Sequence, residues 1–181
     1  MTTQAPAPPA AAPGFSGRYF RAALGSFATG VTVVTTMGED GHGYGMTVNA
    51  FSSVSLDPPL ILVCFDLGSA TLTAILGHGA FAVNVLGAFQ QHLSSNFARR
   101  GLAAVWEGVR HHRRGPTGSP RIEDVLATVE CTVEHILPGG DHQIVVGRVQ
   151  HAETHDGVSP LLFWRGQYVH LEDAPKARLT A

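Results

Sequence analysis

Runs of apolar and β-branched residues recur along the chain and predict that it is built mainly from β-strands. Residues of these types are enriched in strands, where their side chains pack on a pleated surface. The predicted strands are 29–36, 44–55, 60–65, 81–86, 127–137, 142–153 and 161–171. The run 60–65 (LILVCF) is apolar throughout, which is typical of a central strand covered on both faces.

Turn residues separate several of the predicted strands. The segment 39–43 (EDGHG) predicts a turn after which the strand 44–55 returns antiparallel to the strand before it. The segment 138–141 (PGGD) predicts a hairpin turn between the two longest strands. Gly166 indicates an irregularity inside the last strand.

Three segments favour helices: 17–27, 71–76 and 90–100. In the first of them, aromatic and apolar residues fall near helical spacing. Strands outnumber helices, and no regular β-α-β alternation occurs. We therefore predict a mainly β protein, an antiparallel barrel with helices packed outside it.

The length and composition fit one folded domain. With 181 residues and 44% hydrophobic content, the chain can bury a core without disulfide bonds. We expect the domain to span 17–172, between an Ala/Pro-rich tail at 1–16 and a shorter tail at 173–181. Cys64 and Cys131 both lie in apolar runs, so we expect two buried thiols, which suit a reducing cytosol.

Charge and hydropathy exclude several classes of protein. The net charge of −2 and the absence of a long basic run argue against nucleic-acid binding. No segment approaches the roughly 20 apolar residues of a membrane span, and the first residues lack the pattern of a secretory signal. We expect a cytoplasmic protein. The histidine pair His111-His112 has no partner at metal-ligand spacing, so we expect a solvated loop there and no metal site.

A glycine-rich segment, Gly41-His42-Gly43-Tyr44-Gly45, superficially resembles a dinucleotide phosphate loop. Met46 stands where that fingerprint needs its third glycine, and the segment leads into a predicted strand instead of a helix. We interpret it as a hairpin turn. A nucleotide, if one is bound, must be held by other means.

The start of the helix 71–76 offers such a means. Ser69 is placed to cap this helix, and Gly68 eases the entry of the chain. The free N–H groups and partial positive charge of a helix N-terminus, next to the hydroxyls of Ser69 and Thr71, suit a phosphate. An ordinary cap serving only the helix is the alternative. A hydroxyl-bearing strand and the strand end at 64–66 lie upstream, so a longer cofactor could follow the same surface.

Short segments spread over most of the chain form a combination that is more specific than any one of them. They are FATGVTVVT (27–35), GMTVNAFSSVSLDPPL (45–60), SAT (69–71), FAVNVL (81–86), FA (97–98), GDH (140–142), VGRV (146–149) and PLLF (160–163). In this order, over about residues 18–171, they resemble the flavin reductase-like family, whose short NAD(P)H:flavin oxidoreductases serve two-component monooxygenases.

The resemblance implies a split β-barrel of the FMN-binding type that forms a homodimer, with one flavin per subunit near the subunit interface. It implies a flavin, FMN or FAD, with NADH or NADPH as co-substrate, and a monooxygenase partner that receives reduced flavin. The resemblance does not decide between FMN and FAD, or between NADH and NADPH. A non-catalytic flavin- or haem-binding split barrel is the alternative, and the Gly-Asp-His turn favours the enzyme because a passive binder needs no nicotinamide site.

The resemblance also assigns residues. Thr47, Val48, Asn49 and Ala50 match the segment that contacts the flavin ring, and Ser52 and Ser53 lie just beyond it. The positions matching the rest of the flavin are Cys64, Phe65 and Asp66 beside ring and ribityl chain, Ser69 and Thr71 at the phosphate, and Phe97 near the outer portion.

For the nicotinamide nucleotide, the resemblance assigns His142, the candidate catalytic residue, whose imidazole can exchange a proton near neutral pH. Arg148 and Tyr168 are weaker candidates, Tyr168 for cofactor binding. The family often has Tyr where this chain has Phe163.

Some residues stay outside this assignment. We expect Trp106, in the predicted loop 101–120, and Trp164 to be core or interface aromatics. Arg99 and Arg100 follow a predicted helix, so we expect them to offset its C-terminal dipole, with contact to a pyrophosphate as the alternative.

Overall fold

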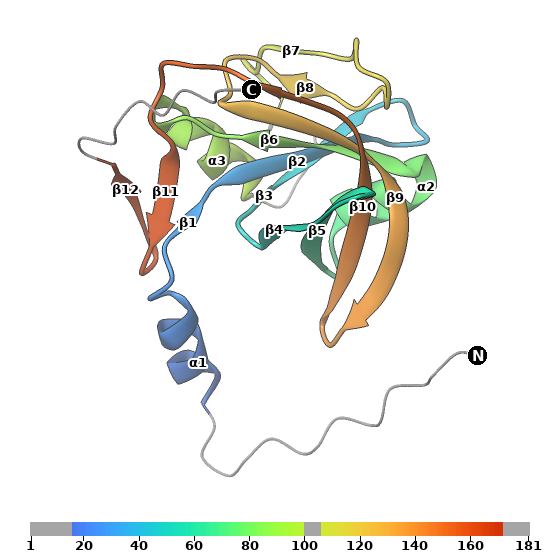
Figure 1. Cartoon of the computed structure of the whole chain (residues 1–181). Coiled ribbons are helices and arrows are strands. Elements are labelled where there is room, and N and C mark those ends of the chain that lie inside the picture. The colour runs from blue at the N-terminus through green and yellow to red at the C-terminus, as the bar shows by residue number, and fades with distance from the viewer. Residues whose placement is uncertain (1–15, 100–105, 172–181) are drawn as a thin grey trace.

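The computed structural model of the protein describes residues 16–99 and 106–171 (Figure 1). Its helices are α1 (Gly17–Leu24), α2 (Ala70–His78), the short 3-10 helix η1 (Ala88–Gln90) and α3 (Gln91–Phe97). The first strands are β1 (Thr29–Gly30), β2 (Thr32–Met37), β3 (Gly43–Val48), β4 (Phe51–Leu56), β5 (Pro59–Asp66) and β6 (Ala80–Val85). The later strands are β7 (His111–His112), β8 (Arg121–Ile122), β9 (Ala127–Gly139), β10 (His142–Thr154), β11 (Leu161–Trp164) and β12 (Gln167–His170).

A seven-stranded antiparallel sheet in the order β3-β2-β6-β9-β10-β5-β4 forms the body of the protein. The edge strands β3 and β4 are consecutive in the chain and are separated only by Asn49 and Ala50. Because two residues connect opposite edges, the sheet must curl until those edges approach each other. The mainly β, antiparallel class predicted from the sequence is confirmed.

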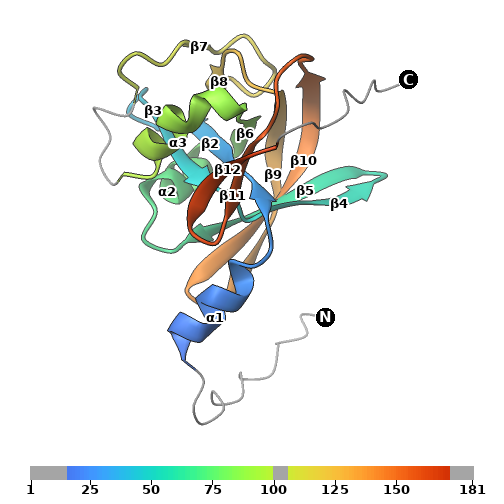
Figure 2. The same ribbon diagram turned by 90° about the vertical axis from the view of Figure 1, so that its left-hand side faces the viewer.

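Two apolar clusters hold the curled sheet together. The larger cluster lies between the sheet and α2, which contributes Leu72 and Ile75 and packs against β2, β3 and β6. The smaller cluster joins the sheet to α3 and to a second sheet of β1, β11 and β12, through residues such as Val33, Phe97 and Leu161. Figure 2 shows α2 and α3 on the same side of the molecule as β3. The two clusters therefore fix the positions of both helices relative to β3.

Three predicted strands are interrupted in the structure, each for a physical reason. The predicted strand 44–55 breaks at Asn49-Ala50 because β3 pairs with β2 whereas β4 pairs with β5. The predicted strand 29–36 breaks at Val31, where the chain passes from the small sheet to the large one. At Gly166 the irregularity is a hairpin turn between β11 and β12, since Arg165 and Gly166 have φ values of 48° and 82°.

The strand β5 is not covered on both faces as its uniformly apolar sequence predicts. It lies between β10 and the edge strand β4, and its burial alternates. Ile61, Val63 and Phe65 are buried in the core, whereas Leu62 and Cys64 on the other face are half-buried. The apolar run is thus explained by one core face and one face that the single chain leaves partly open.

The helix α1 ends at Leu24, three residues before the predicted end, and none of its residues is buried. Figures 1 and 2 show it projecting away from the sheets. Tyr19, Leu24 and Phe27 at and just after this helix expose 76%, 58% and 76% of their surface. Within the described residues, no helix is long and apolar enough to cross a membrane.

Both cysteines are free, but only one of them is fully buried. Cys131 on β9 has no exposed surface, and this burial raises the pKa of its thiol to about 12. Cys64 on β5 is half-buried. The prediction of two buried thiols therefore holds for Cys131 and is only partly met by Cys64.

We expect iodoacetamide at mildly alkaline pH to alkylate Cys64 in the folded protein well before Cys131. The thiolate is the reactive form, and the folded state both hides Cys131 and keeps it protonated. Mass spectrometry of digested samples taken over time measures the two rates. Both thiols should react at similar rates in denaturant, and equal rates in the folded protein would contradict the burial of Cys131.

Candidate functional site

The N-terminus of α2 is built as the sequence predicts. Ser69 is the N-cap, with an extended backbone, and its hydroxyl accepts a hydrogen bond of 3.2 Å from the N–H of Leu72. The helix has nine residues and ends at Gly79, whose φ of 74° is the left-handed conformation that suits glycine. By helix geometry, the N–H groups of Ala70 and Thr71 have no acceptor inside the helix. They are available to a ligand.

A pocket of about 350 Å³ opens at this helix terminus, and we call it the α2 pocket. Its walls come from β3, the end of β5, the first turn of α2 and the end of α3. Of the sequence-predicted site residues, it is lined by Thr47, Asp66, Ser69, Thr71 and Phe97. The curl of the sheet brings these residues together, because β3 and β5 are separated by four strands in the sheet order.

The charges around the α2 pocket favour an anion. The exposed Arg99, just past the end of α3, lines the pocket and adds a positive group to the helix terminus. The carboxylate of Asp66 is also present, but its Oδ1 accepts a hydrogen bond of 2.8 Å from the N–H of Gly68. A phosphate therefore fits here. Arg100, the second arginine considered for this role, lies outside the described residues.

A second, smaller pocket adjoins the first, and we call it the Tyr168 pocket. It has a volume of about 190 Å³, and Thr47 and Ala98 line both pockets. Asn49 and Tyr168, both predicted from the sequence, line it together with Phe163. The Phe163 and Tyr168 rings meet edge to face, with centroids 5.4 Å apart. An aromatic, largely apolar wall of this kind suits a planar ring.

Hydrogen bonds hold the wall between the two pockets in place. The Thr47 hydroxyl donates to the carbonyl of Ser94 at 2.7 Å, and the Ser94 and Tyr168 hydroxyls lie 2.8 Å apart. The Ser69 hydroxyl donates to the sulfur of Met46 at 3.1 Å. These bonds tie β3 to both helices. Phosphate donors at one end and an aromatic slot at the other fit a phosphorylated cofactor with a planar ring.

The Gly-Asp-His turn lies beside the α2 pocket. In the β5–β10 ladder, His142 pairs directly with Asp66, and the carbonyl of Asp141 accepts a hydrogen bond of 3.1 Å from Leu67. The His142 Nδ1 is 2.7 Å from a carboxylate oxygen of Asp141, and this hydrogen bond holds the pKa of Asp141 below its ordinary value. With Nδ1 occupied in this way, Nε2 is the nitrogen left for other contacts.

Six of the positions predicted to contact the flavin line neither pocket: Val48, Ala50, Ser52, Ser53, Cys64 and Phe65. His142, predicted for the nicotinamide nucleotide, lines neither pocket either. Phe65 has no exposed surface and Val48 only 7%, so their side chains belong to the core. Any contact of these two residues with a cofactor would have to come from the backbone. Ala50, Ser52 and Ser53 are exposed at and after the β3–β4 corner. Their roles stay predictions.

The weaker candidate Arg148 has a structural partner. Its guanidinium makes two hydrogen bonds, of 2.8 and 2.6 Å, to the carboxylate of Glu134 on the neighbouring strand β9. A fork-shaped pair of this kind satisfies both side chains. We therefore do not assign Arg148 to the site.

Some lining residues are not identified by the sequence reasoning. Met46 stands next to a predicted position, and Ser94 is fully buried in the middle of α3. Neither residue type signals a binding site, because only the packing of α3 on β3 places them there. Arg99 differs from them, because its charge already suggested contact with a pyrophosphate as an alternative, and it is among the residues that line the α2 pocket.

No group of three or more His, Cys, Asp or Glu side chains that could hold a metal ion occurs in the described parts of the chain. His111 and His112 form the short strand β7, which pairs with β8. The segment 106–120 is therefore not wholly the irregular loop that the sequence predicts.

Residues 24–172 match the family model described as a flavin reductase like domain. A probable flavin reductase of Rhizobium meliloti (strain 1021) is 42% identical over 167 residues, covering 90% of this chain; the chain spans about half of that protein, 51%. The flavin reductase (NADH) of Kitasatospora aureofaciens is 42% identical over 175 residues, covering 93% of this chain and 91% of the relative.

A third relative is the reductase subunit HsaB of a flavin-dependent monooxygenase from Rhodococcus jostii (strain RHA1), 39% identical over 90% of this chain and 82% of the relative. Among solved structures, BorF, the flavin reductase component of a bacterial two-component tryptophan halogenase, is similar with a TM-score of 0.81 and 41% identity. That match covers 88% of this chain and all of BorF.

We expect the double substitution Ser69→Ala, Thr71→Ala to weaken FMN binding more than riboflavin binding. The two ligands share the ring and ribityl chain, and only FMN carries the phosphate that these hydroxyls would contact. Lost hydrogen bonds to a charged group should weaken FMN by about 1–3 kcal/mol relative to riboflavin. Isothermal titration calorimetry measures both affinities.

Thr73→Ala is the matched control, because Thr73 lies on the same helix but is exposed and outside the pocket. It should leave both affinities unchanged. Loss of the Ser69 cap also destabilises the helix by about 1 kcal/mol, and riboflavin reports that shared effect. An equal loss for FMN and riboflavin would show that the phosphate is bound elsewhere.

Proposed function

This chain belongs to the flavin reductase-like family, and we propose from that membership that it is an NAD(P)H-dependent flavin reductase whose reduced flavin is used by a partner monooxygenase. The observation that carries the proposal is the position of the Gly-Asp-His turn. His142 pairs with Asp66, so the predicted nicotinamide side and the α2 pocket, where we place the phosphate, share one strand pair. A protein that only stored flavin would have no need of a nicotinamide site beside its flavin pocket.

The residues of the two pockets would bind and orient the cofactor. The first turn of α2, with Ser69, Thr71 and the cation of Arg99, would hold the flavin phosphate. The aromatic wall of the Tyr168 pocket would support the ring system and exclude water from one side. Stacking the flavin and nicotinamide rings correctly is the main requirement for catalysis, because holding two reactants in position removes much of the entropic barrier to their reaction.

When bound, the flavin supplies an electron-accepting ring whose N5 takes a hydride from C4 of the nicotinamide. The chain would then contribute orientation and proton handling on the nicotinamide side. We assign this role to His142, which Asp141 holds by a hydrogen bond of 2.7 Å to Nδ1. The His142 side chain is 42% exposed, so it can meet an incoming nucleotide.

We further propose that two copies of the chain associate and that the curled sheet is a split β-barrel. Several large apolar side chains are exposed in the single chain, among them Leu56 at 95%, Tyr19 on α1 at 76% and Leu137 at 49%. The outer face of β5 is partly open as well. A second copy would cover such surfaces, and the approach of the sheet edges at Asn49-Ala50 supports barrel closure.

The other assignments of the proposal follow from the family and its members. The relative from Kitasatospora aureofaciens is named as an NADH enzyme, so NADH is the first co-substrate to test, followed by NADPH. The HsaB relative is the reductase subunit of a flavin-dependent monooxygenase, which supports a partner of that class here. The two free thiols suit the cytoplasmic location that we propose.

We expect the purified protein to catalyse loss of the NADH or NADPH absorbance when FMN or FAD is present in excess, without oxygen. The flavin band should bleach at the same rate, because one hydride reduces one flavin. Absorbance at the two bands, followed together in a sealed cuvette, measures both. A protein that binds flavin but leaves NADH and NADPH unconsumed would support the alternative of a non-catalytic binder.

We expect His142→Ala to raise KM for the nicotinamide nucleotide or to slow hydride transfer, while the flavin Kd stays nearly constant. Steady-state kinetics separates the KM and kcat effects, and stopped-flow spectroscopy gives the hydride-transfer rate. His135→Ala is the control, because His135 is an exposed histidine on β9 that pairs with Val146, away from the strand end where His142 pairs with Asp66. Unchanged kinetics in His142→Ala would remove His142 from the nicotinamide side.

A further inference from the structure

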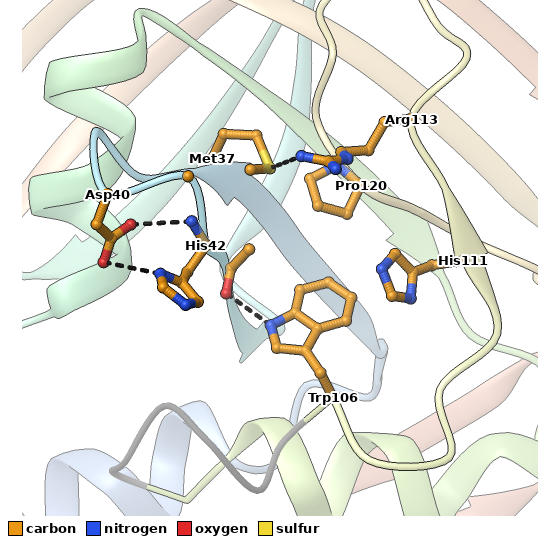
Figure 3. A pocket seen from close by; sticks show the side chains of 9 residues that line it. Met37, Asp40, His42, Trp106, His111, Arg113 and Pro120 are labelled. Carbon is orange, nitrogen blue, oxygen red and sulfur yellow. Dashed lines mark hydrogen bonds and ion pairs between the residues drawn. The ribbon is translucent and has the colours of Figure 1, made fainter.

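A third cavity lies at the β2–β3 hairpin, formed by residues to which the sequence assigns no binding role (Figure 3). We call it the Trp106 cavity; its volume is about 540 Å³. Its walls include Met37, Gly43, Trp106, His111, Arg113 and Pro120. The glycine-rich turn rejected as a phosphate loop forms one side of it, and the segment 106–120 forms the other.

Hydrogen bonds to backbone carbonyls hold two aromatic rings, Trp106 and His111, in the wall of this cavity. The indole Nε1 of Trp106 donates a hydrogen bond of 2.7 Å to the carbonyl of Gly43, which fixes the plane of the ring. The His111 ring lies 4.6 Å from the Trp106 ring between centroids, and its Nδ1 is 2.9 Å from the carbonyl of Val109. Two rings held in this way offer a stacking surface that loses little side-chain entropy on binding.

Arg113 adds a positive group that no acidic side chain of the described residues neutralises. Its only hydrogen bond within the described residues is a 3.5 Å contact with the sulfur of Met37, and no described carboxylate lies within ion-pair distance of it. By contrast, Arg110, Arg121 and Arg148 are each paired with a carboxylate. Arg113 is therefore available to an acceptor or an anion on a ligand.

The acidic side chain of the cavity is already occupied. The Asp40 carboxylate accepts hydrogen bonds from the N–H of His42 at 3.0 Å and from the Tyr44 hydroxyl at 2.9 Å. These bonds lower the pKa of Asp40, so it stays ionised and engaged with its own turn. The cavity as a whole combines aromatic rings, apolar side chains and one free guanidinium, the chemistry that binds a purine nucleoside with a nearby phosphate.

The Trp106 cavity and the α2 pocket are neighbours along β3. Gly43 lines the first and Gly45 lines the second, and two residues of a strand span about 7 Å. Trp106 and Phe97 form the partition between them, meeting edge to face with centroids 5.0 Å apart. The two glycines allow both rings to pack closely on β3. A Cβ at position 43 would lie 3.1 Å from the Trp106 ring, and a Cβ at position 45 would lie 2.7 Å from the Phe97 ring.

We propose that the Trp106 cavity is a subsite for the adenosine portion of FAD. The proposal rests on the function proposed above, with the flavin phosphate at the N-terminus of α2. From that phosphate, the second phosphate and the adenosine would continue past Phe97 and Arg99, so that the adenine stacks on Trp106 and His111 within reach of Arg113. The site would then favour FAD over FMN.

The adenosine of a nicotinamide nucleotide is the other source of the same chemistry, and the arrangement of the fold argues against it. Figure 1 shows β7, which contains His111, at one end of the molecule and the β9–β10 turn, which carries the predicted nicotinamide site, toward the other. The α2 pocket, which holds the proposed flavin phosphate site, lies next to the Trp106 cavity across the contact of Phe97 with Trp106. A flavin dinucleotide therefore has the shorter path into it.

The test compares the affinities of FAD, FMN and NADH by calorimetry in the wild-type protein, Trp106→Ala and Arg113→Gln. The wild type should bind FAD more tightly than FMN, and each variant should lower the FAD-to-FMN affinity ratio by on the order of 10-fold, the scale of one stacked base. Arg114→Gln is the matched control, because Arg114 is the adjacent exposed arginine and does not line the cavity. Its ratio should equal that of the wild type.

Trp106 also packs on Phe97, so Trp106→Ala could disturb the α2 pocket. Arg113→Gln leaves this packing intact and keeps the test decisive, and Trp106→Phe should restore most of the ratio. Equal ratios in Arg113→Gln, Trp106→Ala and the wild type would overturn the subsite. A loss of NADH affinity without a change in the FAD-to-FMN ratio would assign the cavity to the nicotinamide nucleotide and overturn the FAD proposal.

The subsite and the proposed function fail in different ways. FMN binding with NADH-dependent FMN reduction, but with no contribution from Trp106 or Arg113 to FAD affinity, would leave the function standing and remove the subsite. A protein that binds neither FMN nor FAD would remove both.

Discussion

The two-residue connection between β3 and β4 is the constraint on which the rest of the structure depends. These strands form opposite edges of a seven-stranded sheet, yet only Asn49 and Ala50 separate them. The sheet therefore has to curl, and the curl brings the end of β5 to the side of β3 where α2 and α3 pack. Both pockets of the candidate site result from this geometric requirement. The direct pairing of β10 with β5 then places His142 beside Asp66 at the edge of this site.

Buried polar contacts extend this arrangement to the segment that carries Trp106. The Asn84 amide donates to the carbonyl of Val33 at 3.0 Å and accepts from the N–H of Ile122 at 2.9 Å, while Thr35 donates to the carbonyl of Pro120. Glu130, with no exposed surface, accepts a hydrogen bond from the Thr117 hydroxyl at 2.7 Å and lies 3.5 Å from the guanidinium of Arg121. Removing one partner of such a buried set is costly, so the far wall of the Trp106 cavity is anchored to the main sheet.

The sequence predicts well the features that depend on neighbouring residues. The Ser69 cap, the hairpin at Gly140-Asp141 and the rejection of the glycine-rich turn as a phosphate loop all come from local chemistry, and each agrees with the structure. Strand boundaries were wrong where the chain changes partner, at Val31 and at Asn49-Ala50. Their apolar and hydroxyl residues are compatible with a continuous strand, and only the pairing with β11 or β5 decides the break.

For the site, the sequence by itself determined the helix terminus with its two hydroxyls, the Gly-Asp-His turn and, through the combined motifs, the family. The helix terminus, the turn and each short motif behind the family are contiguous in the chain, so residue type and spacing are enough to recognise them. Only the tertiary structure decided that Phe65 faces the core, that Ser94 and Arg99 join the pocket walls, and that Trp106 and Arg113 share a cavity with a rejected turn. These relations join residues distant in sequence, and packing across a curled sheet, which no local pattern encodes, brings them together.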